Sequence, residues 1–222
     1  MRILKTSTPE AFIAAALQHL TDVIIAAQAD GKTITVGLSG GSTPKPIYEK
    51  LSLEKKIDWK RVRFFLLDER YVPTDHSDSN TKMIHETLLM NDAASAPFLF
   101  PDTTLPLEDC IAKYDNIVSA LRPDLVILGM GSDGHIASLF PPVPPEAFGP
   151  ASVIHTQTDR FAIRDRISVT FPVLEAAEKR VFLITGAEKS ALLSKMQIDM
   201  QDGSLSPASV LMDDRTTWVV GS

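Results

Sequence analysis

Short apolar runs alternate with helix-like segments along almost the whole chain, and this alternation limits the possible fold more than any other feature. Val62–Leu67 and Leu125–Leu128 are nearly continuous in apolar residues, which is typical of strands buried on both faces of a parallel sheet. Such a sheet needs helices to cover each of its faces. We therefore predict an α/β fold with a mostly parallel sheet and helices on both faces. The predicted strands are Thr33–Leu38, Val62–Leu67, Leu125–Leu128, Ile167–Phe171, Val181–Thr185 and Trp218–Val220.

Helix signals lie between these runs. Ser7-Thr8-Pro9-Glu10 combines hydroxyl caps, an early proline and an early acid, which is typical of a helix start. The predicted helices run from that point to about Ala29, over Pro44–Leu51, Thr81–Met90 and Leu107–Leu121, and over Glu188–Lys195. No repeat or linker divides the chain, so we predict one domain over residues 1–222. Pro141–Pro145 cannot be a helix interior, and we expect a surface loop there, placed to close over a site.

Composition excludes several classes of protein. The net charge of −6 argues against non-specific nucleic-acid binding, which needs a basic surface. Cys110 is the single cysteine, so the sequence has no internal disulfide framework and fits a reducing compartment. No run approaches 18 apolar residues, and the N-terminus lacks the pattern of a signal peptide. We expect a cytoplasmic protein with no membrane and no nucleic-acid partner, and the oligomeric state stays open between monomer and homodimer.

A glycine-containing turn follows the first predicted strand. Its residues Ser39, Gly40, Gly41, Ser42 and Thr43 lead through Pro44 into a helix. Adjacent glycines let backbone N–H groups approach a ligand, and a helix start attracts anions. The turn is neither a P-loop nor a dinucleotide-binding fingerprint. We predict a phosphate-type anion site, with a simple tight turn as the alternative.

A charged cluster ends the second buried strand. Asp68-Glu69-Arg70 lies at the carboxyl edge of the predicted sheet, where open α/β folds bind ligands. An arginine there can bind phosphate bidentately. The alternative is a solvated surface ion pair, but the shared edge with the Ser39–Thr43 turn favours a functional role.

The segment that follows Leu125–Leu128 is the sharpest catalytic candidate. Gly129-Met130-Gly131-Ser132-Asp133-Gly134-His135 brings an acid and an imidazole to the same edge of the sheet. A histidine can accept a proton from water near neutral pH, and a nearby acid can orient the ring. The alternative is that His135 caps a following helix. His19, His76 and His155 have no evident partners, and His85-Glu86 lacks the second histidine of a zinc motif, so we predict no metal.

Basic residues late in the chain could complete an anion site. Arg166 stands at the start of a predicted strand, Arg164 lies two residues before it, and Lys189 follows a strand-to-helix junction. Each of them is a weak signal alone. Together they could balance the charge of a phosphate dianion.

These blocks, in this order, resemble the 6-phosphogluconolactonase family. The resemblance rests chiefly on Gly37–Pro44, Asp68–Pro73 with Ser79-Asn80, and Gly129–Pro141, and more weakly on Arg166–Thr170 with Pro172 and Leu174, Gly186–Lys189 and Pro207–Ser209. It implies a modified Rossmann-like α/β fold without a cofactor. It also implies hydrolysis of 6-phospho-D-glucono-1,5-lactone to 6-phosphogluconate in the oxidative pentose phosphate pathway.

The resemblance also implies roles for individual residues. His135 would be the general base that activates water, Asp133 would shape the catalytic turn, and Asp68 would line the sugar side of the pocket. The phosphate and the ring would be held by Ser39–Thr43, Arg70, Arg166 and Lys189. The chain reads Phe161-Ala162-Ile163-Arg164-Asp165 where the family often has prolines, so Arg164 and Arg166 compete for one role.

Two alternative functions remain at this point. Glucosamine-6-phosphate deaminases are similar to this family but carry a glutamate after the Asp-Gly-His turn, where this chain has Phe140. They also tend to have Asp-Glu-Tyr in place of Asp68-Glu69-Arg70. Both differences favour lactone hydrolysis over a deaminase or isomerase. A non-catalytic phosphosugar sensor would need the phosphate turn but not His135.

Overall fold

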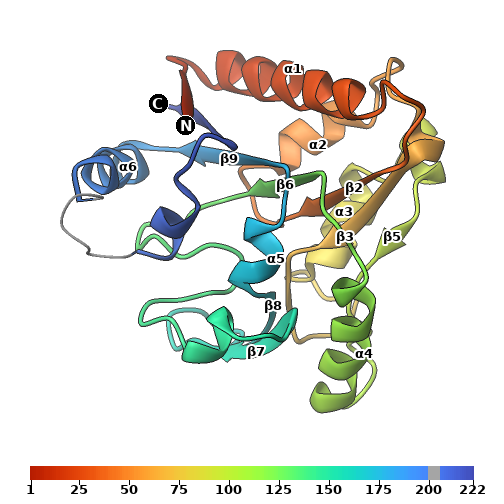
Figure 1. Cartoon of the computed structure of the whole chain (residues 1–222), viewed down its shortest axis with the longest axis vertical. Coiled ribbons are helices and arrows are strands. Elements are labelled where there is room, and N and C mark those ends of the chain that lie inside the picture. The colour runs from red at the N-terminus through yellow and green to blue at the C-terminus, as the bar shows by residue number, and fades with distance from the viewer. Residues whose placement is uncertain (200–205) are drawn as a thin grey trace.

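The computed structural model describes residues 1–199 and 206–222. Seven parallel strands form its central sheet, in the order β1-β10-β9-β6-β2-β3-β5 (Figure 1). The prediction of a mostly parallel α/β sheet is confirmed. The strands of this sheet are β1 (Arg2–Lys5), β2 (Ile34–Leu38), β3 (Val62–Leu66), β5 (Phe98–Leu99), β6 (Leu125–Leu128), β9 (Lys179–Thr185) and β10 (Thr216–Gly221).

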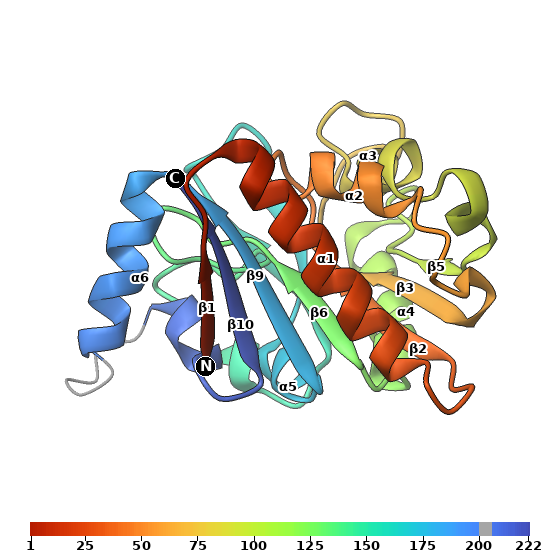
Figure 2. The same ribbon diagram turned by 90° about the horizontal axis from the view of Figure 1, so that it is seen from above.

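Helices cover both faces of this sheet, as predicted. One face packs against α1 (Pro9–Ala27), α2 (Lys45–Leu51) and α3 (Asn80–Thr87), and Figure 2 shows α1 lying across it. The other face packs against α4 (Leu107–Ser119), α5 (Phe171–Glu175) and α6 (Ala187–Asp199). In the part of the chain that the structure describes, four short 3₁₀ helices complete the helical segments, at Trp59–Arg61, Asn91–Ser95, Pro145–Phe148 and Pro207–Leu211.

The strand sequences are continuously apolar because both faces of the sheet are covered. In β6, Leu125 and Ile127 join the core on the side of α1, whereas Val126 and Leu128 join the core on the side of α4. Successive side chains of a strand point to opposite faces, so each of the two cores takes every second residue. All four residues are buried.

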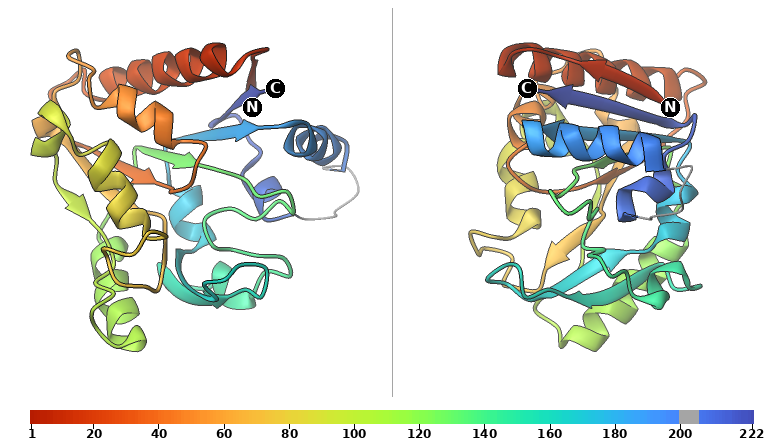
Figure 3. Two further views of the ribbon diagram at one scale, coloured as in Figure 1. Left: turned by 180° about the vertical axis from the view of Figure 1, so that it is seen from behind. Right: turned by 90° about the vertical axis from the view of Figure 1, so that its left-hand side faces the viewer.

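A second, smaller sheet was not predicted. It is antiparallel, with the order β4-β8-β7, and consists of β4 (Asp68–Arg70), β8 (Asp165–Val169) and β7 (Val153–Gln157). The prediction of a strand over Ile167–Phe171 was wrong at its end, because Phe171 begins α5. Figures 1 and 3 show β7 and β8 to one side of the central sheet, with α4 nearby. The strand β1 was also missed; it pairs in parallel with β10, so the N-terminus and the C-terminus lie at opposite ends of this strand pair (Figures 2 and 3).

By length and composition alone, α1 could cross a membrane, which the sequence analysis had excluded. Its mean hydropathy is 1.4 over an 18-residue window. In the folded chain, a stripe made of Phe12, Ala16, Leu20 and Ile24 is buried against the sheet and α2. A soluble core helix passes the same test of length and hydropathy, so this observation alone is weak evidence for a membrane span.

The strand order places a topological switch point at the centre of the sheet. From β2 the chain proceeds outward through β3 to β5, and from β6 it proceeds the other way through β9 and β10. Loops that leave the carboxyl ends of β2 and β6 therefore diverge and leave a crevice between them. Open α/β sheets bind their ligands at such a point.

Candidate active site

A cavity of about 540 Å³ lies at this switch point. The structure brings every predicted site residue to its wall. These residues are Ser39, Gly40, Gly41, Ser42, Thr43, Asp68, Arg70, Asp133, His135, Arg166 and Lys189. They come from the ends of β2 and β6, from the small antiparallel sheet and from the first turn of α6. The cavity thus combines an acid–base pair with several cationic side chains.

The turn after β6 joins His135 to Asp133. The Asp133 Oδ1 atom lies 2.5 Å from His135 Nδ1 and accepts the backbone N–H of His135 at 3.1 Å. Burial acts to raise the pKa of Asp133, but the hydrogen bonds from the backbone and ring of His135 and the charge of Arg160 lower it below its usual value. The carboxylate therefore stays ionised and favours a proton on Nδ1. In a neutral ring this leaves Nε2 free to accept a proton.

Gly131 is required by the close approach of this pair. A Cβ atom at Gly131 would lie 2.1 Å from His135 Nδ1 and 2.6 Å from Asp133 Oδ1. The backbone around the pair closes on itself, because the Gly131 N–H donates to the His135 carbonyl and the Gly134 N–H donates to the Gly131 carbonyl. The predicted alternative of His135 as a helix cap was wrong, because residues 136–140 form a turn with one isolated bridge.

Aromatic rings surround the imidazole. The ring centroid of His135 lies 4.6 Å from that of Phe140 and 6.0 Å from that of Phe161. On the other side of the turn, Arg160 forms an ion pair with the Oδ2 atom of Asp133. Both Asp133 oxygens are therefore engaged, one by His135 and one by Arg160.

The Ser39–Thr43 turn presents backbone donors to the cavity. Within residues 1–199 and 206–222, no protein group accepts the N–H groups of Gly40, Gly41, Ser42 or Thr43, and the buried Ser39 hydroxyl has no partner. A Cβ atom at Gly40 would lie 1.9 Å from the Asn80 side chain, so glycine is needed where the turn meets α3. Unused donors on one wall of a cavity suit an anion.

Strand β4 fixes the wall beside this turn. Asp68 is buried and accepts a hydrogen bond from the Ser138 hydroxyl at 2.7 Å. Its neighbour Glu69 points to the other side of the strand and accepts three hydrogen bonds at the start of α3 and a fourth from the backbone N–H of Arg70. Burial raises the pKa of Glu69, and these donors oppose the rise. Glu69 therefore organises the wall without lining the cavity.

Two arginines face each other across the small sheet. Arg70 pairs in register with Arg166, and Arg166 is only 5% exposed. Burial and then the neighbouring charge of Arg70 lower the pKa of Arg166. Neither guanidinium forms an ion pair with a carboxylate in the part of the chain that the structure describes. Adjacent cations without a direct carboxylate partner are suited to a multiply charged anion.

The structure separates the two rival arginines. Arg166 lines the cavity, whereas Arg164 is 61% exposed and forms an ion pair with Asp159 at 2.7 Å outside it. The Pro141–Pro145 loop does not line the cavity, contrary to the expectation that it closes over the site. Arg160 and Phe161, on the turn between β7 and β8, line it instead.

Sequence reasoning missed several side chains around the cavity. They include Asn80, Ser138, Arg160 and Phe161. Asn80 and Ser138 lay inside blocks that carried the family resemblance, Phe161 lay in the segment that departs from the family pattern, and Arg160 had no local pattern to mark it. His155 was predicted to lack a partner, but it lies in β7 and its Nε2 is 2.9 Å from Asp165. Among the described residues, no group of three His, Cys, Asp or Glu side chains is placed to hold a metal ion.

The fold and the cavity define an α/β enzyme with a His–Asp pair and a group of cationic side chains at the carboxyl edge of a parallel sheet. Residues 7–219 match the family described as glucosamine-6-phosphate isomerases/6-phosphogluconolactonase. The chain belongs to this family.

Individual relatives also support the assignment of the chain to this family. A probable 6-phosphogluconolactonase of Dictyostelium discoideum is 40% identical over 194 residues, which cover 83% of this chain and 82% of the relative. The 6-phosphogluconolactonase of Thermotoga maritima is 38% identical over 193 residues, which cover 85% and 84% of the two chains. The solved structure of the Thermotoga maritima enzyme superposes with a TM-score of 0.87 and 33% identity, covering all of both chains. A 6-phosphogluconolactonase structure from Shewanella baltica gives a TM-score of 0.87 at 26% identity, over 100% of this chain and 97% of that one.

Proposed function

We propose that this chain is a lactone hydrolase that converts 6-phospho-D-glucono-1,5-lactone to 6-phosphogluconate, with His135 as the general base. The observation that carries the proposal is the His135–Asp133 pair in a cavity that also contains Arg70, Arg166 and Lys189. The names of the relatives support the substrate. The reaction would be the lactonase step of the oxidative pentose phosphate pathway, and we place it in the cytoplasm.

In the proposed reaction, His135 Nε2 removes a proton from a water molecule. The water oxygen forms a bond to the lactone carbonyl carbon, and the carbonyl oxygen takes up negative charge. The bond from that carbon to the ring oxygen then breaks, and the ring oxygen receives the proton as it becomes a hydroxyl group. The products are an open-chain carboxylic acid, which ionises, and a regenerated neutral histidine. A positioned base contributes about 10²–10⁴-fold to such a rate.

The cationic side of the cavity would hold the phosphate. Arg70 and Arg166 are adjacent and line the cavity, and Lys189 approaches from the first turn of α6. The free N–H groups of the Ser39–Thr43 turn add uncharged donors on the wall next to them. Binding at the phosphate, remote from the carbonyl, restrains the lactone so that attack on it becomes effectively intramolecular.

Phe140 supports hydrolysis rather than deamination. Its ring packs 4.6 Å from His135 and is 8% exposed, so an apolar side chain occupies the position of the deaminase glutamate. A carboxylate there would be needed to move protons during opening of an aminosugar ring. Asp68 is already engaged by Ser138, so we assign it to the sugar side of the cavity.

The test is a rate assay with freshly made lactone, corrected for spontaneous hydrolysis. We expect the wild-type chain to accelerate formation of 6-phosphogluconate, and His135→Gln to lower kcat by about 10²–10⁴-fold. His19→Gln, a histidine on α1 outside the cavity, serves as the matched control. A His135→Gln variant with the wild-type rate would contradict the base assignment. Ammonia release from glucosamine 6-phosphate, or binding of 6-phosphogluconate without turnover of the lactone, would contradict the activity itself.

A further inference from the structure

The turn between β7 and β8, residues Thr158–Arg164, lies over the acid–base pair, and we call it the β7–β8 tip. It is closed by its own hydrogen bonds. The Thr158 N–H donates to the Arg164 carbonyl at 3.1 Å, and the Arg160 N–H donates to the Thr158 hydroxyl at 3.2 Å. The tip therefore presents Arg160 and Phe161 to the cavity from a turn of defined shape.

Arg160 completes a chain of contacts that ends at the imidazole. Its guanidinium donates to Asp133 Oδ2, while Asp133 Oδ1 receives Nδ1 and the backbone N–H of His135. The Asp133 side chain is only 19% exposed, so its two oxygens are held largely by these protein donors. Movement of Arg160 would free Asp133 Oδ2. It would change the orientation of the carboxylate and the distribution of negative charge between its two oxygens.

Phe161, on the same tip, packs beside the imidazole of the His135–Asp133 pair. Its ring lies 6.0 Å from the rings of both His135 and Phe140, and the Arg166 guanidinium lies over it at 5.4 Å. Arg160 and Phe161 are each about half exposed, at 50% and 49%. The β7–β8 tip thus shields the acid–base pair from water on one side while it borders the cavity on the other.

We propose that Arg160 is a positioning residue that sets the basicity of His135 through Asp133, a role that rests on the proposed function of His135 as a base. The Arg160 charge neutralises part of the Asp133 charge. When Arg160 is removed, the full carboxylate charge stabilises the protonated imidazole. His135 would then stay protonated to higher pH and be less available as a base.

The other charged side chains around His135 do not replace the effect of the Arg160 charge on Asp133. The cavity wall supplies Asp68 from β4, Arg70 and Arg166 from the small sheet, and Lys189 from α6. Only Asp133 and Arg160 are in direct ionic contact with the imidazole or its partner, among the described residues.

The decisive measurement is an NMR titration of the His135 ring in the full chain, without substrate. We expect Arg160→Gln to move the midpoint of His135 protonation to higher pH by on the order of one unit. Arg160→Lys, which keeps the charge, should return most of the shift. Arg164→Gln is the matched control on the same tip, because Arg164 pairs with Asp159 outside the cavity. An unchanged midpoint in Arg160→Gln would overturn the proposal.

Kinetics supply a second readout. In Arg160→Gln, the acidic limb of the pH profile of kcat/KM should shift to higher pH, as the His135 midpoint does. The variant's kcat/KM should be about tenfold below the wild-type value at pH values below both midpoints, and the two profiles should meet at high pH. KM for the lactone should change little. A pH-independent loss would indicate a merely structural role, and a raised KM with an unshifted limb would place Arg160 on the substrate, so either result overturns the proposal. Wild-type protein without lactonase activity would refute the proposed function, whereas the substrate-free titration would still decide the role of Arg160.

Discussion

Arg164 and Arg166 are two residues apart, yet the structure gives them opposite environments. Because side chains alternate along a strand, residues at this spacing share a face only while the strand is regular. Arg164 precedes β8 and turns to Asp159, whereas Arg166 lies within β8 and its Nε donates to the Ile163 carbonyl at 3.1 Å. Charge type alone could not distinguish them, because the distinction comes from where β8 begins.

Substitution of these two arginines should separate substrate binding from chemistry. Arg166→Gln removes one charged donor of the proposed phosphate site, and a hydrogen bond to a charged group contributes about 1.5–3 kcal/mol. We expect KM for the lactone to rise about 10–100-fold with a much smaller change in kcat, since the phosphate is bound alike in ground and transition states. Arg164→Gln should leave both constants near the wild-type values. Steady-state rates with fresh lactone check this, and equal effects of the two variants would contradict the assignment.

Asp133 and His135 could be predicted from sequence because their turn keeps acid, glycine and imidazole adjacent. Arg160 could not, since its contact with Asp133 spans 27 residues and depends on how the β7–β8 tip folds back over the turn. The same reason applies to Ser138, which reaches Asp68 across 70 residues. Local pattern identifies residues that share a turn, whereas residues brought in from a separate sheet need the tertiary structure.

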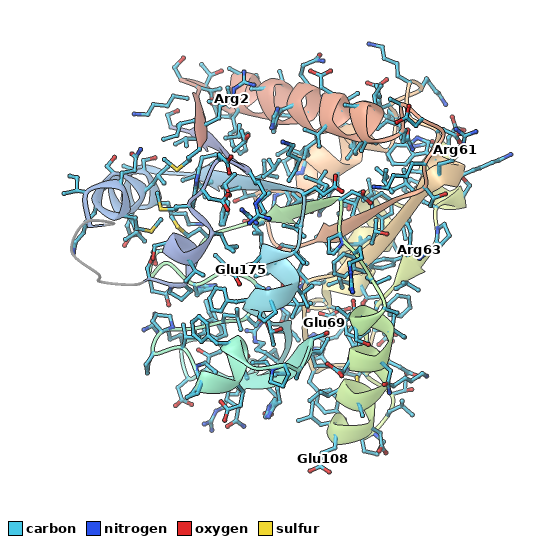
Figure 4. All side chains as sticks on the ribbon, in the orientation of Figure 1. Arg2, Arg61, Arg63, Glu69, Glu108 and Glu175 are labelled. Carbon is cyan, nitrogen blue, oxygen red and sulfur yellow. The ribbon has the colours of Figure 1, made fainter. Side chains whose placement is uncertain are left out.

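At the scale of elements, the start of α3 depends on a side chain from β4. Glu69 Oε1 accepts the backbone N–H groups of Arg70 and Asn80, both at 2.8 Å. Its Oε2 accepts the Thr81 N–H at 2.7 Å and the Ser79 hydroxyl at 3.1 Å. Figure 4 shows Glu69 within the fold, whereas Glu108 projects from the end of α4. One carboxylate therefore joins the small sheet to the helix that carries Asn80.

Glu69→Gln should destabilise the protein through this junction. The amide nitrogen cannot accept hydrogen bonds, so about half of the donors lose their partner, while removal of a buried charge offsets part of the cost. We expect the free energy of unfolding to fall by about 2–4 kcal/mol in denaturant titrations. Glu86→Gln, an exposed glutamate on the same helix, should change it by less than about 0.5 kcal/mol. A Glu69→Gln variant as stable as the wild type would show that the four contacts add nothing to stability.

The elements that sequence predicted are those with a strong apolar pattern. β6 and β9 are buried on both faces and were found with nearly their observed bounds. β4 consists of Asp68, Glu69 and Arg70, which have no strand propensity to detect. It becomes a strand only because β8 supplies hydrogen-bonding partners from about 100 residues away in sequence. The antiparallel sheet was missed because its pairing is long-range and its strands are short and partly polar.

At the scale of the whole molecule, the central sheet separates two hydrophobic cores. The core beneath α1 contains Trp59, and the core beneath α4 and α6 contains Trp218. Both indoles are buried, and Trp218 stacks on Phe182 with ring centroids 3.9 Å apart. Because the same strands contribute to both cores, loss of either core should disrupt the strands on which the other core depends. This coupling is the physical basis for the prediction of one domain over residues 1–222.

The two tryptophans allow that prediction to be tested, since the chain has no others. Trp218→Phe leaves Trp59 to report on one core, and Trp59→Phe leaves Trp218 to report on the other. In each variant we expect the fluorescence transition in urea to coincide with loss of helical circular dichroism, with equal midpoints and slopes, as two-state unfolding requires. The variants differ in stability, so the comparison is between probes within one variant. A fluorescence transition displaced from the dichroism transition in either variant would show that the two cores unfold separately, and the chain would then comprise more than one cooperative unit.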